Sequence, residues 1–308
     1  MLGFREFKDE FISSCRSSIA SFTDCFDCGD IEIEERSVTK AQRGSLSGLI
    51  FRAPGTIAAP TYYVEDFYKM YRDGASIGDL SFEIARNAFH FIHEAPVFPS
   101  VEIAGFFEDP SKLRVRLINS LRNPELLKNV PHRDTGCGLS LIPEVRSGEF
   151  RAVVTNELMK SFGMSADELL DKSLENAASY DPAVLADLTE VLSVGQDNCE
   201  NLLEGPLSSV LPAPGSLCVL SNKSFCWGAS ALFYAGMAPR LSGLLGGDFY
   251  VLPSSVHEVL LLPAAVGDPE NLIETIHEGN RTVVSDEEFL SDDLIICESG
   301  RLRIFDPQ

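Results

Sequence analysis

Short strand-like segments, joined in pairs by glycine-containing turns, recur along this chain and limit the folds open to it. The pairs are residues 31–38 with 45–51, 139–145 with 150–154, and 294–297 with 302–305. Strands that are joined by a short turn pair in the antiparallel sense. Helical segments lie between these pairs, without a regular strand–helix–strand alternation and without a glycine-rich phosphate loop. The sequence therefore predicts an α+β protein with antiparallel or mixed sheets and helices packed on one face.

A repeated order of elements is a second regularity. The passages that begin at Val64 and Val154 share a strand end, a short helix, a glycine break and a longer helix. This order predicts repeated β-β-α-α units. A length of 308 residues fits one large or two medium domains. We expect an N-terminal unit of residues 1–125 and a C-terminal unit of residues 126–308, or one continuous domain with a loop at 195–215.

Two local signals predict helix starts in the middle of the chain. Ser165 and Glu168 have the spacing of a capping box, in which each side chain satisfies a free backbone amide of the other residue. Asp181 is followed by Pro182, and proline is favoured at the first helical position. We therefore expect one helix to follow Ser165 and another to begin at residues 181–182.

The charge of the chain favours some partners and disfavours others. A formal net charge of −21 repels nucleic acid and anionic lipid, and it attracts a basic protein or peptide. The densest basic run is interpreted as the solvated face of a helix; it consists of Lys112, Arg114, Arg116, Arg122, Lys128 and Arg133. No run of 18 or more apolar residues is present, and the N-terminus lacks the order of a signal peptide. We expect a cytoplasmic protein that binds neither membrane nor nucleic acid.

Motifs of high specificity for a reaction or a cofactor are absent from the sequence, so no cofactor is predicted. The strongest candidate site joins two distant segments, in which His132 and Asp134 follow Pro131 and in which His257 and Glu258 follow Pro253. Histidine with a carboxylate is a minimal general base and a common metal shell. His257 and Glu258 are adjacent in an expected strand, so at most one of them faces a given cleft. The alternative is that each histidine ring hydrogen-bonds a neighbouring turn.

Weaker candidates have simpler interpretations. Cys25 and Cys28 form a single CxxC, which follows a helix and lacks the strand-to-helix setting of a redox pair. His90 and His93 share a helix face but have no evident third metal ligand. A nucleophile at Ser254 or Ser255 lacks the sharp turn that exposes a catalytic serine.

The string LPSSVHEVLLLP is the most specific part of a signature that extends over nearly the whole chain, and three earlier passages match in order: residues 48–52 with 62–71, 126–133, and 155–158. In these residues the chain resembles a bacterial family of unknown function that is found in gut anaerobes. The residues of this signature are Asn222, Lys223, Gly228, Pro253, Ser254, Ser255, His257 and Glu258. The resemblance implies a bacterial, cytoplasmic setting and carries over no catalytic residue.

The sequence thus favours a non-enzymatic binding or interaction protein with an acidic surface. The main alternative is a metal-assisted hydrolase that uses His132 and His257. A third hypothesis is that the acidic C-terminal end regulates a neighbouring complex. The oligomeric state has no signal in the sequence.

Overall fold

The computed structural model describes residues 1–26, 31–40, 43–53, 59–94, 108–147, 150–196, 198–204 and 216–307. The chain divides into two compact units, one of Met1–Lys40 with Gly44–Ala104 and the other of Ala41–Arg43 with Gly105–Gln308. The division falls near residue 104, whereas the sequence suggested residue 125. The strand β4 (Leu113–Asn119) accounts for the difference, because all its residues pair with β6 (Leu139–Ser147) of the second unit.

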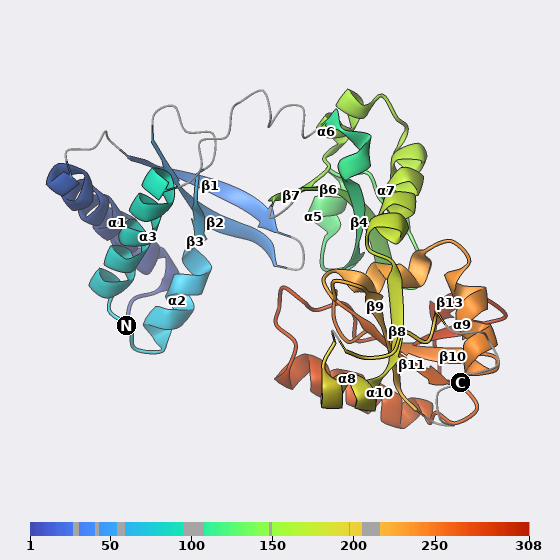
Figure 1. Cartoon of the computed structure of the whole chain (residues 1–308). Helices are drawn as coiled ribbons and strands as arrows, with labels where there is room; N and C mark the ends of the chain where they lie inside the picture. The colour runs from blue at the N-terminus through green and yellow to red at the C-terminus, as the bar shows by residue number, and fades with distance from the viewer. Residues whose placement is uncertain are drawn as a thin grey trace. The chain divides into compact units, whose positions relative to one another are not determined.

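The first unit combines an antiparallel sheet with helices (Figure 1). Its strands, in spatial order, are β1 (Glu32–Lys40), β2 (Gly44–Arg52) and β3 (Thr61–Tyr63). Its helices are α1 (Phe4–Phe26), α2 (Val64–Arg72) and α3 (Ile77–Glu94). The apolar stripe of α1 supplies the buried Phe7 and Phe11, whose rings stack 5.1 Å apart. Aromatic side chains of α2 pack on this stripe, so one face of each helix makes the core of the unit.

Two antiparallel sheets build the second unit. The first sheet has the order β4-β6-β5, and β7 also pairs with β6; β5 is Arg133–Asp134 and β7 is Phe150–Val153. The second sheet has the order β13-β12-β10-β11-β9-β8. The bounds of its strands are β8 Ala183–Asp187, β9 Cys218–Asn222, β10 Phe249–Leu252, β11 Val259–Pro263, β12 Ile295–Glu298 and β13 Arg301–Ile304.

Helices connect and cover these sheets. The α-helices are α5 (Pro124–Leu127), α6 (Asn156–Met159), α7 (Ala166–Tyr180), α8 (Leu188–Val194), α9 (Met237–Leu245) and α10 (Pro269–Thr282). Short 3-10 helices are η1 (Pro110–Lys112), η2 (Lys160–Phe162) and η3 (Gly228–Phe233). Helix α7 begins at the predicted capping box, in which the side chains of Ser165 and Glu168 each accept a hydrogen bond from the backbone amide of the other residue.

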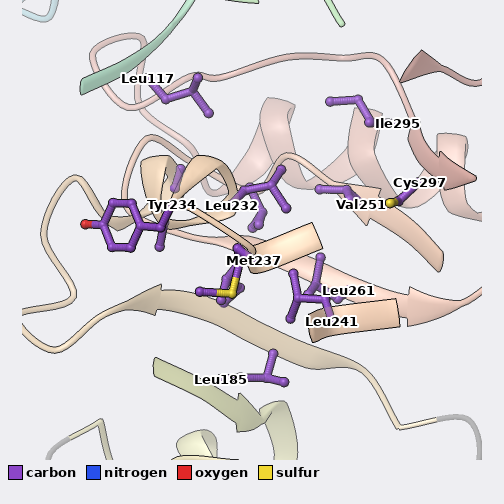
Figure 2. Packing of buried hydrophobic residues seen from close by; sticks show 14 of the residues in the cluster. Leu117, Leu185, Leu232, Tyr234, Met237, Leu241, Val251, Leu261, Ile295 and Cys297 are labelled. Atoms are coloured by element: carbon purple, nitrogen blue, oxygen red, sulfur yellow. The ribbon is translucent and has the colours of Figure 1, made fainter. Parts of the chain in front are cut away.

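One hydrophobic core joins the two sheets of the second unit. Leu117 of β4 belongs to the same buried cluster as Leu185, Val251, Leu261 and Ile295 of the six-stranded sheet (Figure 2). Apolar side chains of η3 and α9 fill the space beside them, among them Leu232, Met237 and Leu241 (Figure 2). Because the core is continuous, residues on the two sheets hold fixed positions relative to each other.

The α+β fold with antiparallel sheets is confirmed, since each strand pair of the described residues is antiparallel. The order hairpin, short helix and longer helix occurs in both units, but a structural repeat is not confirmed and stays a prediction. The helix expected after Asp181-Pro182 is wrong. Ala183–Asp187 forms β8, because this segment pairs along its length with the fully buried strand β9.

A search of the described part of the chain for membrane-spanning helices gives none with the length and hydropathy that a bilayer crossing requires.

Candidate functional site

The residues of the signature meet where the loop after β9 touches the connection between β10 and β11. Ser221 Oγ donates a hydrogen bond to the carbonyl oxygen of His257 at 2.8 Å. Gly228 lies against the same two segments, and a Cβ atom there would come within 2.5 Å of the Asn222 backbone nitrogen and 2.7 Å of the His257 oxygen. Glycine is therefore the residue that allows the two backbones to approach this closely.

Side chains of the loop fix its path over residues 222–227. Asn222 Oδ1 accepts a hydrogen bond from the Cys226 amide, while Asn222 Nδ2 donates to the Cys226 carbonyl. The buried carboxylate of Asp181 accepts from the amide and the hydroxyl of Ser224, at 2.9 and 2.5 Å. Phe225 and Trp227 both have left-handed backbones, with φ of 48° and 59°. Such conformations cost about 1–3 kcal/mol each and persist only where the surroundings impose them.

A stack of contacting side chains crosses this loop, and its members are Glu144, Arg116, Trp227, His257 and Glu288. The Trp227 amide donates to His257 Nδ1 at 3.1 Å, so Nδ1 is the unprotonated nitrogen of that imidazole. His257 Nε2 then carries the proton and lies 3.5 Å from Glu288 Oε1. The indole and imidazole rings are 5.3 Å apart between centroids. Ser285 Oγ donates to the other carboxylate oxygen of Glu288 and so positions this acid.

The stack continues from Trp227 to a buried ion pair on the smaller sheet. The guanidinium carbon of Arg116 lies 3.6 Å from the centroid of the Trp227 ring, within cation–π range. Arg116 Nε lies 2.7 Å from Glu144 Oε2, and the side chain of Glu144 is only 2% exposed. Neither atom makes a well-directed hydrogen bond, so the contact is an ion pair held by charge alone. Burial raises the pKa of Glu144, and the nearby arginines, Arg116 foremost, oppose this shift.

An acidic pocket of about 320 Å³ opens beside His257. Its ionisable lining groups are His257, Glu258 and Glu288, and its apolar lining is Phe225, Val283 and Val284. Among the described residues, no lysine or arginine lines it. Burial raises the pKa of Glu258; the neighbouring His257 lowers it, and Glu288 raises it further.

The lining of this pocket contains signature residues and bears on one prediction. Ser254 and Ser255 line it together with His257 and Glu258, so four residues of the signature share one cavity. The expectation that His257 and Glu258 face opposite sides of a strand is wrong. Strand β11 begins only at Val259, and the two residues before it lie in a turn, where the alternation of a strand does not apply.

His132 and Asp134 lie elsewhere, on the short strand β5 and its approach. The exposed ring of His132 is hydrogen-bonded through Nδ1 to the Val130 carbonyl at 3.1 Å. Asp134 Oδ1 accepts from the Gly136 amide and closes a turn. In the described part of the chain, no recorded contact joins either residue to His257 or Glu258, and neither lines the acidic pocket. His132 thus contacts its own segment of the chain, whereas His257 contacts Trp227 and Glu288.

The structure also bears on the candidate metal, nucleophile and CxxC sites. No three or more of the His, Cys, Asp and Glu side chains that the structure describes are grouped to hold a metal ion. Ser255 Oγ accepts from the backbone amide of His257, so this hydroxyl is paired with the main chain and not with the imidazole. Cys28 lies outside the described residues, as does the side chain of His93.

Sequence reasoning missed the roles of Glu288, Glu144 and Arg116 in this stack. Glu288 has no motif around it, and Glu144 lies inside an apolar strand, where a buried acid is uncommon. Arg114 and Arg116 were interpreted as part of a helix face, which is wrong because both lie on β4. The alternation of Leu113, Val115 and Leu117 with polar partners was the available signal, since a period of two is typical of a strand.

Comparison with family models gives a match over residues 4–296 to a family of unknown function, DUF5688. Comparison with curated proteins and with solved structures gives no match.

Proposed function

The chain belongs to this family of unknown function, and we propose that it is a cytoplasmic, non-enzymatic binding protein whose acidic pocket takes a cationic group of a basic peptide or protein. The observation that carries the proposal is the lining of the pocket. Two carboxylates, Glu258 and Glu288, enter one cavity whose other walls are polar or apolar and bear no lysine or arginine among the described residues.

The shape and polarity of the pocket favour a lysine or arginine side chain. Such a side chain has an apolar stem and a charged tip. Phe225, Val283 and Val284 offer an apolar wall for the stem, and the carboxylates of Glu258 and Glu288 offer partners for the tip. Two carboxylates at one site repel each other, so a cation that enters between them relieves this repulsion.

The raised pKa of Glu258 also favours the binding of a cation. Burial makes its negative charge costly, and Glu288 adds to this cost. A bound cation offsets both effects and favours the ionised form. The net charge of −21 further draws a basic partner towards the protein at long range.

Binding of a fluorescently labelled hexalysine peptide, followed by anisotropy, tests this proposal. We expect saturable binding that weakens about tenfold or more in the variant Glu258→Gln/Glu288→Gln, since each lost ion pair in a partly buried site contributes about 1 kcal/mol. The matched control is Glu10→Gln/Glu83→Gln, which removes the same charge from exposed positions of the first unit. Equal weakening of peptide binding in both variants would show that the peptide responds only to the net charge of the protein, and would refute binding at a specific pocket.

Acidification gives a second prediction for the same peptide. Because burial raises the pKa of Glu258, this carboxyl takes up its proton at a higher pH than an exposed one. The affinity for hexalysine should therefore fall as the pH is lowered, before exposed carboxylates titrate. In Glu258→Gln the first part of this loss should vanish; an unchanged pH profile would contradict the assignment of Glu258.

A further inference from the structure

Four arginines gather on one face of the smaller sheet of the second unit, around a single carboxylate. Arg114 and Arg116 alternate along β4, and Glu144 and Arg146 alternate along β6. Arg114 is paired in register with Glu144, and Arg146 with Arg151 of β7. Side chains opposite each other, or two apart in a strand, share a face, so all five groups project to the same side.

Positive charge is poorly compensated on this face. Arg146 makes no ion pair with another described residue, and the polar contact recorded for the Arg151 side chain is with Cys226 Sγ at 3.3 Å. Directly opposed like charges, as in Arg146 and Arg151, destabilise a strand pair. An arrangement that costs stability without a bound partner is typical of a site that binds one.

Hydrogen bonding at the centre of the cluster is incomplete. Arg114 is 8% exposed; its Nη1 donates to the carbonyl oxygens of Ser111 and Leu113, whereas its Nε has no hydrogen-bond partner among the described residues. Arg116 Nε faces the carboxylate of Glu144 but makes no well-directed hydrogen bond with it. Asp181 lies near Arg114, but its carboxylate accepts hydrogen bonds from Ser224. A buried donor that lacks an acceptor is costly and rare in native proteins.

We infer that this arginine face is a second binding site, which takes the phosphate group of a small phosphate-bearing ligand. Guanidinium groups present paired N–H donors that match the oxygens of phosphate in a bidentate manner. Arg146 and Arg151, the more accessible members, make the first contacts, and the less exposed Arg116 adds positive charge on the same face. A dianion offsets more of the excess positive charge than a monoanion does. This site does not depend on the acidic pocket, whose lining includes none of these arginines.

Glu144 competes with the ligand for the same arginines. Its carboxylate already neutralises part of the cluster, and burial makes this charge costly, as its raised pKa shows. Removing the charge of Glu144 while keeping the size of its side chain should therefore leave more guanidinium N–H groups for an external anion. The variant Glu144→Gln is consequently expected to bind phosphate more tightly, which is a gain that loss of folding cannot imitate.

Isothermal titration of the full chain with inorganic phosphate tests the site, at an ionic strength of about 0.15 M, where the long-range field of the protein is screened. We expect saturable binding that weakens about tenfold in Arg146→Ala/Arg151→Ala and strengthens several-fold in Glu144→Gln, as expected for charge-assisted contacts. The control Arg5→Ala/Arg86→Ala removes two exposed arginines from the first unit and should leave binding unchanged.

Three outcomes would overturn the inference. They are the absence of saturable phosphate binding by the unmodified protein, equal losses in the two double-alanine variants, and equal binding of acetate and phosphate at matched ionic strength. The last result would show a general anion effect without preference for phosphate. Circular dichroism of each variant confirms that a loss of binding does not arise from unfolding.

Discussion

Replacing Gly228 with alanine should unfold or severely destabilise the second unit. The added Cβ would lie 2.2 Å from Ser221 Oγ, 2.5 Å from the Asn222 backbone nitrogen and 2.7 Å from the His257 backbone oxygen. The serine hydroxyl can rotate away, but the two backbone atoms cannot move without separating β9 from the turn before β11. Overpacking of a rigid site costs about 1–3 kcal/mol and occasionally more, and we expect about 3 kcal/mol or more here because two of the clashes are with backbone.

Urea denaturation measures the loss of stability and shows whether it falls in the second unit. Trp227 is the sole tryptophan and lies next to Gly228, so its fluorescence reports the second unit, while circular dichroism reports the whole chain. The matched control is Gly279→Ala in α10, where an added Cβ meets nothing within 4 Å. This control should be neutral or more stable by up to about 1 kcal/mol, as expected from helix propensity. A midpoint for Gly228→Ala equal to that of the unmodified protein would show that the two backbones can separate freely.

Replacing Glu144 with alanine should cost about 3–5 kcal/mol, the usual effect of removing one partner from a buried ion pair. The change leaves Arg116, whose side chain is 14% exposed, without its carboxylate, and it removes the buried volume of the Glu144 side chain. Glu144→Gln should be milder, because it keeps the volume and because burial already disfavours the charged form of Glu144. Denaturant midpoints of the two variants separate the contribution of volume from that of charge.

An exposed ion pair provides the comparison for Glu144. Arg303 and Glu298 are 2.7 Å apart, but both side chains are nearly half exposed. Glu298→Ala should therefore change the stability by less than about 1 kcal/mol. The replacement of both buried partners, Arg116→Met/Glu144→Leu, should recover part of the loss, because it leaves no unpaired buried charge. If Glu144→Ala were no more costly than Glu298→Ala, the buried pair would have no role in stability.

These predictions bear on function because the stack from Glu144 to Glu288 lies between the two proposed sites. Arg116 belongs to the arginine face and His257 belongs to the acidic pocket, and both contact the indole of Trp227. The fluorescence of Trp227 is therefore expected to respond to ligands at either site. The response to hexalysine should survive Arg146→Ala/Arg151→Ala, and the response to phosphate should survive Glu258→Gln/Glu288→Gln.

Features whose causes lie within a few neighbouring residues were predictable from the amino-acid order alone. The hairpins formed as predicted around their short turns, because loop length and turn residues select antiparallel pairing locally. The helix after Ser165 began at its capping box for the same reason. The signature string also directed attention to His257 and Glu258, which do share a pocket.

Features that depend on partners far away in the chain formed only through long-range packing. Residues after Pro182 became β8 because pairing with buried β9 outweighs a local helix start. Arg114 and Arg116 became parts of a strand because their apolar neighbours fill the shared core. The left-handed backbone of Trp227 follows from contacts with His257 and Arg116, which are distant in sequence. Local propensities amount to a few tenths of a kcal/mol per residue, so a buried partner elsewhere in the chain readily overrides them.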